Sequence, residues 1–478
     1  MSQTIAGSSV ADIGGAGGRS ATRGWVRVGM IGLAAAVIVV VFGKATFGGV
    51  ILAAAVLVCV RYRLFASAAV AVIPLQTFGV ALGPINLRIS HAFIVLYLCY
   101  VLVLRRLRLP KAASLPGQRS LAAFFILAVL SLAWSMDPAG GIVYLAKLAI
   151  AVTLAAAIVL DPRPANRVTG ELAWGVAASI VFVLGFQLAV VMRSGLGLGD
   201  IARPGDVLAT GGAALHQIGV LVNPTFAGGR NLLAAWLSTA LFVLVYMRWQ
   251  PTRLGSRRRN LIILALAGAT ILSLIVTLSR TNWIATSVGL SAFILLSSGK
   301  GRLQGIGILL IVTVLLMWLD SMGASGLLVN RVTAVARSQD VGVTGRFALW
   351  QEGLEGFARQ PMIGLGVGSA SAIARKVSSG WIEVDNLHNV YLQFLTDLGL
   401  IGLVLFLVFV ARSMFWGLSK VLRSRSAMRS QGAAVLAMLL ALWTRSLAQG
   451  QLNDLESWLV IAFFYVVVRS IAPRSVGR

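Results

Sequence analysis

Four residues have types and positions that could support chemistry at a membrane surface: Arg280, Arg346, His388 and Asn389. His388 and Asn389 stand directly before a long apolar run, and the chain contains only three histidines. An imidazole at a membrane–water boundary can accept a proton near neutral pH. The alternative is an ordinary interfacial histidine that begins a helix. Both roles remain open for His388 taken alone.

Arg280 lies in the sequence LSRT, between two runs that are otherwise apolar. A short turn at the membrane face needs no arginine for its structure. An arginine near lipid depth is costly unless its side chain snorkels to the interface or has a partner, and it then marks a functional site. Snorkelling is the structural alternative for this residue.

Arg346 lies in GRFALWQEGL, in the first turn of a predicted amphipathic helix. The helix dipole disfavours arginine there, so helix stability does not explain it. A helix N-terminus and a guanidinium together suit a phosphate group, although a solvated surface arginine is the alternative. We predict this surface helix over Thr344–Gln360, with Pro361 as its stop and with apolar residues at Phe347, Trp350, Leu354 and Phe357.

Other polar residues flank the same apolar runs. Arg230 directly precedes one run and could add a phosphate contact, whereas Arg203 and His216 are interpreted as structural. Asp454 and Glu456 could assist proton transfer or cap the last helix. The glycine-rich run Gly364–Ser369 is interpreted as a tight connection, because no strand precedes it as in a nucleotide-binding loop.

The sequence contains no metal-ligand cluster, no Walker motif and no catalytic pair of aspartates. Catalysis without metal, ATP or another cofactor is therefore expected if the protein is an enzyme.

Composition identifies the broad class of protein. The chain has 478 residues, of which 58% are hydrophobic, too many for a soluble domain. Apolar runs long enough to cross a bilayer recur along it, which predicts an all-α polytopic integral membrane protein with about 12–14 transmembrane helices. The predicted spans are roughly 25–43, 46–60, 65–82, 90–104, 119–135, 142–160, 171–192, 231–247, 260–278, 282–298, 303–319, 389–411, 432–448 and 456–470.

The net charge of +26 comes largely from basic clusters that lie between apolar runs. This arrangement is the positive-inside signature of cytoplasmic loops and argues against a nucleic-acid partner. It places residues 193–230, the 279–281 turn and the long segment 320–388 on the external side. We divide the chain into a disordered cytoplasmic tail (1–22), N-terminal transmembrane helices (23–200), a catalytic membrane region (201–470, including loop 320–388) and a cytoplasmic tail (471–478).

Three motifs in order resemble the O-antigen ligase and polymerase superfamily. They are SRT at 279–281, GRFALWQEGLEGFARQPMIGLGVGS at 345–369 and HNVYLQFLTDLGLIG at 388–402. The last is similar to the H-N-x9-G-x-x-G pattern of O-antigen ligases, through His388, Asn389, Gly399 and Gly402. The resemblance covers roughly 205–470, and the family usually has about 12 spans.

The resemblance implies an inverting, metal-independent glycosyltransferase in the bacterial inner membrane, multi-pass and with its active site facing the periplasm. It would move a glycan from undecaprenyl pyrophosphate to the lipid A-core oligosaccharide, among membrane lipids. Arg280 and Arg346 would bind the pyrophosphate, and His388 would act as general base or orient the acceptor hydroxyl. The supporting residues and their implied roles are Asn389 (holding the imidazole or hydroxyl), Trp350 (a sugar platform or an interfacial anchor), Arg230 (a phosphate contact), and Gly399 and Gly402 (close helix packing).

Other functions share much of this pattern. A polysaccharide polymerase would use a second lipid-linked repeat as acceptor, and a protein O-oligosaccharyltransferase would use a protein hydroxyl. A transporter or flippase would need polar residues along a path at mid-membrane. The spans carry almost no charge at their centres, and the candidate residues gather on one face, which favours chemistry at the outer leaflet.

Overall fold

The computed structural model describes a helical protein with one short hairpin. It describes residues 64–75, 79–82, 85–104, 115–194, 229–250, 256–277, 279–319, 341–377, 386–450 and 452–471. The predicted spans 25–43 and 46–60, Arg203 and His216 lie outside these residues.

The hairpin consists of β1 (Gly79–Leu82) and β2 (Ile85–Arg88), paired antiparallel with Gly79 opposite Arg88. The helices are α3 (Phe65–Ala71), α4 (Ile89–Leu104), α5 (Gln118–Leu130), the 3-10 turn η1 (Ser131–Trp134), α6 (Pro138–Leu160), α7 (Ala165–Ser194), α11 (Arg230–Arg248), α12 (Ser256–Val276), α13 (Arg280–Leu296), α14 (Gly299–Leu319), α16 (Val341–Arg359), α17 (Ser369–Val377), α18 (Val390–Leu422), α19 (Ser426–Arg445) and α20 (Leu455–Ser470).

The all-α polytopic class is confirmed. Within the described part of the chain, five helices are long and apolar enough to cross a membrane: α6, α7, α11, α12 and α18. Helices α4 and α5 are apolar but shorter. The amphipathic surface helix predicted over 344–360 is α16, which ends at Arg359, just before Pro361.

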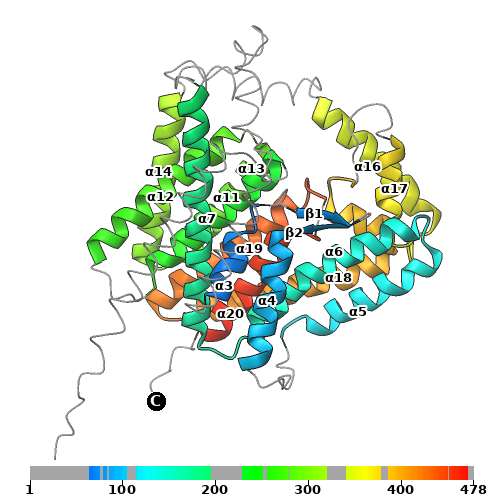
Figure 1. Cartoon of the computed structure of the whole chain (residues 1–478), viewed down its shortest axis with the longest axis horizontal. Coiled ribbons are helices and arrows are strands. Elements are labelled where there is room, and N and C mark those ends of the chain that lie inside the picture. The colour runs from blue at the N-terminus through cyan, green and yellow to red at the C-terminus, as the bar shows by residue number, and fades with distance from the viewer. Residues whose placement is uncertain are drawn as a thin grey trace, which may run out of the picture.

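The centre of the bundle is formed by α11, α13, α19 and α20 (Figure 1). Of the apolar window of α11, 83% is buried inside the protein, against 33% for α6 and for α12. Helix α11 is therefore a core helix, whereas much of the surface of α6 and α12 is exposed and available to contact lipid. Helices α7, α12 and α14 stand together at one edge, and α16 and α17 lie at the other.

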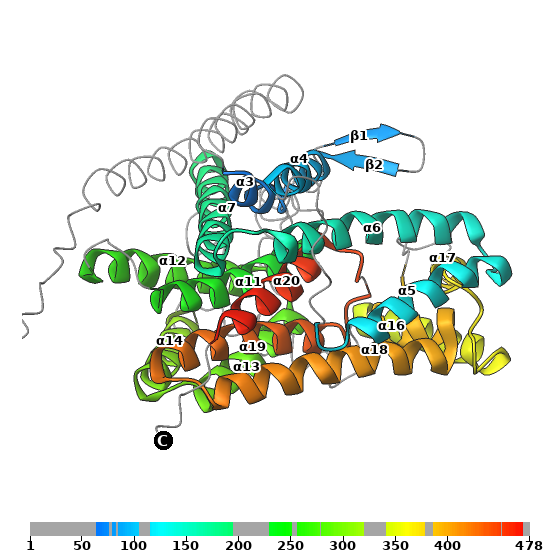
Figure 2. The same cartoon turned by 90° about the horizontal axis from the view of Figure 1, so that it is seen from below.

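Helix α18 runs beside α5, and α16 and α17 cover the end at which α18 begins (Figure 2). This end holds the N-termini of the long helices that follow the predicted external segments. His388 and Asn389 therefore lie at the end of α18 against which α16, the helix of Arg346 and Trp350, packs.

The single span predicted over 65–82 is wrong. Helix α3 ends at Ala71, a turn containing Pro74 follows, and Gly79 begins β1. Proline has no N–H to donate and its ring clashes with the carbonyl one turn earlier, so an α-helix cannot continue through Pro74 undisturbed. An apolar run alone does not show this break.

The span predicted over 389–411 corresponds to α18, but this helix is broken at Gly399 (φ 63°, ψ −165°), which was not predicted. In an unbroken helix Leu400 and Ile401 would donate to the carbonyls of Thr396 and Asp397. Here those two carbonyls accept instead from Leu365 (2.9 Å) and Gly366 (2.8 Å). Leu400 and Ile401 donate in turn to the carbonyls of Pro361 (2.8 Å) and Met362 (3.2 Å). We call this set of four backbone hydrogen bonds the Gly399 latch.

The glycine-rich run at 364–369 is a tight connection, as predicted. Gly364, Gly366 and Gly368 all have positive φ, and Gly366 and Gly368 lie against backbone within Ser131–Gly141, which runs from η1 into the first turn of α6. Asp397 is buried in α18 and accepts the N–H of Ala370 (2.7 Å), which anchors the first turn of α17. The run thus fixes α16 and α17 to the membrane helices.

Candidate active site

Arg280 and Arg230 begin two neighbouring helices. Arg280 is the first residue of α13 and is half-buried, and Arg230 is the exposed first residue of α11. The hydroxyl of Ser279 donates to the side-chain carbonyl of Asn231 at 2.9 Å. This hydrogen bond joins the residue before Arg280 to the residue after Arg230, so the two arginines head helices that are held together at their N-termini.

Neither N-terminus is capped by the residue that precedes it. Gly229 has no side chain, and Ser279 makes no capping hydrogen bond to α13. The first turn of an uncapped helix presents backbone N–H groups and the positive end of the helix dipole. Two such termini, each beginning with an arginine, form an arrangement suited to a phosphate-bearing ligand.

The connection between α19 and α20 brings His388 to this pair. The amide of Gln449 donates to the Asn231 carbonyl at 3.3 Å. The next residue, Gly450, lies against the Asn386 side chain and the His388 backbone, where an added Cβ atom would stand 2.8 Å from the His388 nitrogen. The N–H of Val390 also donates to the Ser446 carbonyl at 2.9 Å. The connection therefore contacts α11 on one side and the start of α18 on the other.

His388 has a strained backbone. Its φ is 52°, and it is the one non-glycine residue with positive φ in the described ranges. The side chain of Asn386 supports this conformation, because its Oδ1 accepts the His388 N–H at 2.9 Å. Histidine is among the residues that adopt this region more readily, yet such positions still cost on the order of 1–3 kcal/mol and cluster at functional sites.

Asn389 is the N-cap of α18. Its side-chain oxygen accepts the N–H of Leu392 at 3.0 Å, so this oxygen is already engaged. The predicted role of Asn389 in holding the imidazole or an acceptor hydroxyl stays a prediction. The amide NH₂ group of the side chain would have to make that contact. This capping role was not predicted, although asparagine before an apolar run is a helix-start signal.

Trp350 holds the segment before His388. Its indole N–H donates to the Leu387 carbonyl at 2.9 Å, and its ring meets Phe347 edge-to-face at 5.5 Å. Trp350 therefore also positions the backbone before His388, in addition to its predicted role as a sugar platform or interfacial anchor. Arg346 is half-buried and precedes Trp350 by four residues, which places both on one face of α16.

Asp454 and Glu456 do not cap α20. Glu456 is buried and accepts from Arg445 (Nη1 to Oε1, 2.9 Å) and from the hydroxyl of Thr239, so it ties α20 to α19 and α11. Asp454 occupies the N-cap position without a side-chain capping bond. Burial lowers the pKa of Arg88 from its ordinary value, whereas the charge of Asp454 raises it, which places a further arginine near this segment.

The two predicted glycines of the pattern have different environments. Gly399 is the break in α18, where a Cβ would meet the backbone of Met362 and Gly364. At Gly402 the nearest atoms to an added Cβ belong to the Leu398 side chain. Close packing against a second helix is therefore wrong for Gly399, which contacts a loop, and stays a prediction for Gly402, which is buried.

Asn231, Gln449 and Asn386 are structural members of the site that the sequence analysis missed. Each is a polar residue at the edge of an apolar run, and this edge position was the available signal. No group of three or more histidine, cysteine, aspartate or glutamate side chains that could hold a metal is found among the residues that the structure describes.

The fold and the site define a multi-pass membrane protein whose polar, arginine-rich cluster lies where several helix N-termini meet. The family model described as O-antigen ligase matches residues 262–407, from within α12 into α18. This match makes the chain similar to O-antigen ligases over that region. It includes Arg280, Arg346 and His388. No curated protein matches the chain.

Proposed function

We propose that the protein transfers a glycan from undecaprenyl pyrophosphate to the lipid A-core oligosaccharide at the periplasmic face of the bacterial inner membrane. One observation carries the proposal: two uncapped, arginine-headed helix N-termini are joined through Ser279 and Asn231 and linked through Gln449 and Gly450 to a strained histidine. The O-antigen ligase match supports the same class of reaction.

In this reaction the diphosphate of the donor lies against the N-termini of α11 and α13. Arg280 and Arg230 face its charge, and Arg346 of α16 adds a third guanidinium. Charge grows on the diphosphate oxygen as the bond to the anomeric carbon breaks, and cationic and N–H groups placed there stabilise the transition state. Because these groups supply positive charge, the proposal requires no metal ion.

His388 takes the proton of the acceptor hydroxyl through its imidazole. The acceptor oxygen forms a bond to the anomeric carbon on the face opposite the diphosphate, and the configuration inverts. The diphosphate leaves with the electron pair of the broken bond as undecaprenyl pyrophosphate. The strained backbone of His388 and the Trp350 contact at Leu387 hold the imidazole for this step.

The test is transfer by the purified full-length protein in detergent, with EDTA and without ATP. The donor is undecaprenyl-pyrophosphate glycan, offered with lipid A-core or alone. Glycosylated lipid A is the expected product. Longer glycans on the undecaprenyl carrier, with lipid A unmodified, would instead show a polymerase and refute the proposed acceptor.

Variants at His388 separate its chemistry from its backbone strain. His388→Asn keeps a residue type that tolerates positive φ, and His388→Gly removes the strain altogether. Both should lower transfer about 10²- to 10⁴-fold, the range for loss of a general base. Arg302→Ala, at an exposed position in the first turn of α14, is the matched control and should leave transfer unchanged. Normal turnover by His388→Asn would exclude the general-base role.

A further inference from the structure

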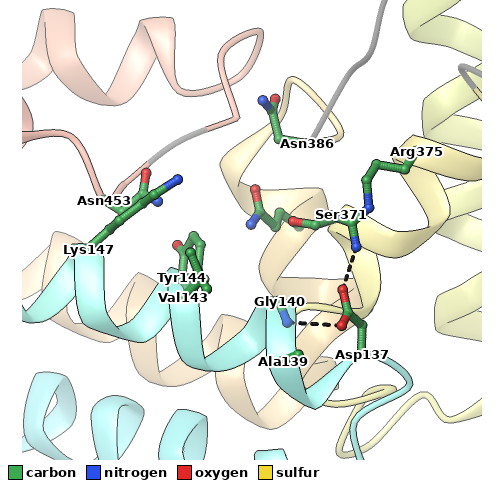
Figure 3. A pocket seen from close by; sticks show the side chains of 11 residues that line it. Asp137, Ala139, Gly140, Val143, Tyr144, Lys147, Ser371, Arg375, Asn386 and Asn453 are labelled. Carbon is green, nitrogen blue, oxygen red and sulfur yellow. Dashed lines mark hydrogen bonds and ion pairs between the residues drawn. The ribbon is translucent and has the colours of Figure 1, made fainter. Parts of the chain in front are cut away.

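A polar cavity of about 350 Å³ lies beside the candidate active site (Figure 3). Its volume is at the lower end of the range for small-ligand pockets. It is formed by the first turns of α6, by α17, by the start of α18 and by the segment before α20. Its lining residues are Asp137, Ala139, Gly140, Val143, Tyr144, Lys147, Ser371, Arg375, Asn386, Gln393 and Asn453.

Three buried polar atoms on lining residues have no hydrogen-bond partner among the described residues. They are the hydroxyl of Tyr144 and the side-chain carbonyl oxygens of Gln393 and Asn453. Gln393 is 2% exposed, so water does not replace the missing partner freely. Buried polar groups in folded proteins are nearly always paired. Three unpaired groups on the wall of one cavity therefore indicate a polar ligand.

The types of these groups define the chemistry of that ligand. A tyrosine hydroxyl can donate and accept, and amide carbonyls accept, so the complementary groups are hydroxyls that do both. Sugars present several such hydroxyls within a volume of this size. Ser371 and the carboxamide of Asn386 add further polar groups to the wall.

The charged residues of the lining are Asp137, Arg375 and Lys147, which together carry a net charge of one positive unit. Arg375 and Asp137 form an ion pair with each other and neutralise one another. Lys147 is exposed and extends across the cavity toward Asn453. A sugar that carries a carboxylate or phosphate would place its charge near this ammonium group.

We propose that this cavity is a saccharide subsite, which takes a sugar residue bearing an acidic substituent. Asn386 connects it to the active site, because this residue lines the cavity and also holds the His388 N–H. The inference rests on the proposed function in that the sugar belongs either to the transferred glycan or to the acceptor. Both sources share this chemistry.

The test measures binding directly and does not depend on turnover. The probes are two soluble oligosaccharides, one released from the undecaprenyl carrier and one released from lipid A by mild acid. Each is titrated into the full-length protein in detergent and followed by saturation-transfer NMR and calorimetry. We expect one probe to bind, and the probe that binds identifies the source.

Tyr144→Phe removes a hydroxyl that has no hydrogen-bond partner in the described part of the chain, so folding should be unharmed or improved. Binding of the probe should weaken about 2- to 10-fold, as expected for one lost hydrogen bond. Lys147→Gln should weaken binding of the acidic probe and leave unchanged the binding of a probe whose carboxylate has been reduced to an alcohol or whose phosphate has been removed. Tyr246→Phe is the matched control. Tyr246 lies near the C-terminal end of α11, away from the cavity, and its hydroxyl donates to Thr169 of α7. It should lower thermal stability and leave binding unchanged.

The inference is overturned if the wild-type protein binds neither oligosaccharide, or if Tyr144→Phe binds both as the wild type does. Failure of the proposed function has a different signature. Binding that depends on Tyr144, without transfer to any acceptor, would support the saccharide subsite and refute the ligase assignment.

Discussion

Gly399→Ala is the substitution that most directly tests how this site is assembled. Gly399 has φ 63° and ψ −165°, a region that is essentially restricted to glycine. Its break in α18 frees the carbonyls and N–H groups that form the Gly399 latch with residues 361–366. The latch fixes the loop that connects α16 to α17. Loss of the break should therefore release both helices.

Two contributions set the magnitude of the effect. A non-glycine residue in this backbone region costs about 1–3 kcal/mol, which lowers the ratio of latched to unlatched protein about 5- to 150-fold. The added Cβ would also stand 2.6 Å from the Gly364 nitrogen, a backbone atom that cannot rotate away. Each backbone hydrogen bond lost with the latch contributes about 0.5–1.5 kcal/mol.

The assay combines glycan transfer with limited proteolysis and thermal unfolding in detergent. We expect Gly399→Ala to lower transfer at least about 10-fold and to speed cleavage between 341 and 377. Gly268→Ala is the control, because this helical glycine in α12 has open space around it. It should be neutral or slightly stabilising. Wild-type stability, cleavage and transfer in Gly399→Ala would refute the role assigned to the latch.

Two further substitutions test contacts behind the site. Trp350→Phe removes the donor to the Leu387 carbonyl, and we expect a cost of about 1–3 kcal/mol, read as slower transfer with an unchanged donor KM. Slower transfer with a raised donor KM would indicate a binding role instead. Glu456→Ala leaves Arg445 buried and unpaired, so the free energy of unfolding should fall by about 3–5 kcal/mol in thermal or chemical denaturation. The double variant Arg445→Met with Glu456→Met should recover most of this loss. A double variant as unstable as Glu456→Ala would contradict the ion-pair explanation.

Much of the helical frame could be predicted from apolar runs. The predicted spans 142–160 and 282–298 correspond to α6 (Pro138–Leu160) and α13 (Arg280–Leu296). The amphipathic spacing before Pro361 likewise located α16. These features depend on local periodicity and on residues that stop helices, which the sequence shows directly.

The features that could not be predicted depend on distant contacts. The break at Gly399 requires the 361–366 loop, and a glycine within an apolar run is equally compatible with a continuous helix. The capping role of Asn389 could have been predicted from its local sequence. The Trp350 contact with Leu387 could not, because the two residues are 37 positions apart in the chain. The cavity beside His388 joins Tyr144 to Gln393 and Asn453, and no local pattern relates these residues.

The break at Gly399 also divides α18 into a part long enough to span a membrane and a shorter part that follows His388. Leu400–Leu422 is about 34 Å long at about 1.5 Å per residue, enough to cross a hydrocarbon core of about 30 Å without the preceding turns. Val390–Leu398, on the other side of the break, forms a pedestal about 14 Å long. This pedestal includes buried Gln393 and Asp397, which would be costly next to lipid chains. In the proposed reaction this pedestal would hold the imidazole away from the acyl chains, while Leu400–Leu422 would stay among them.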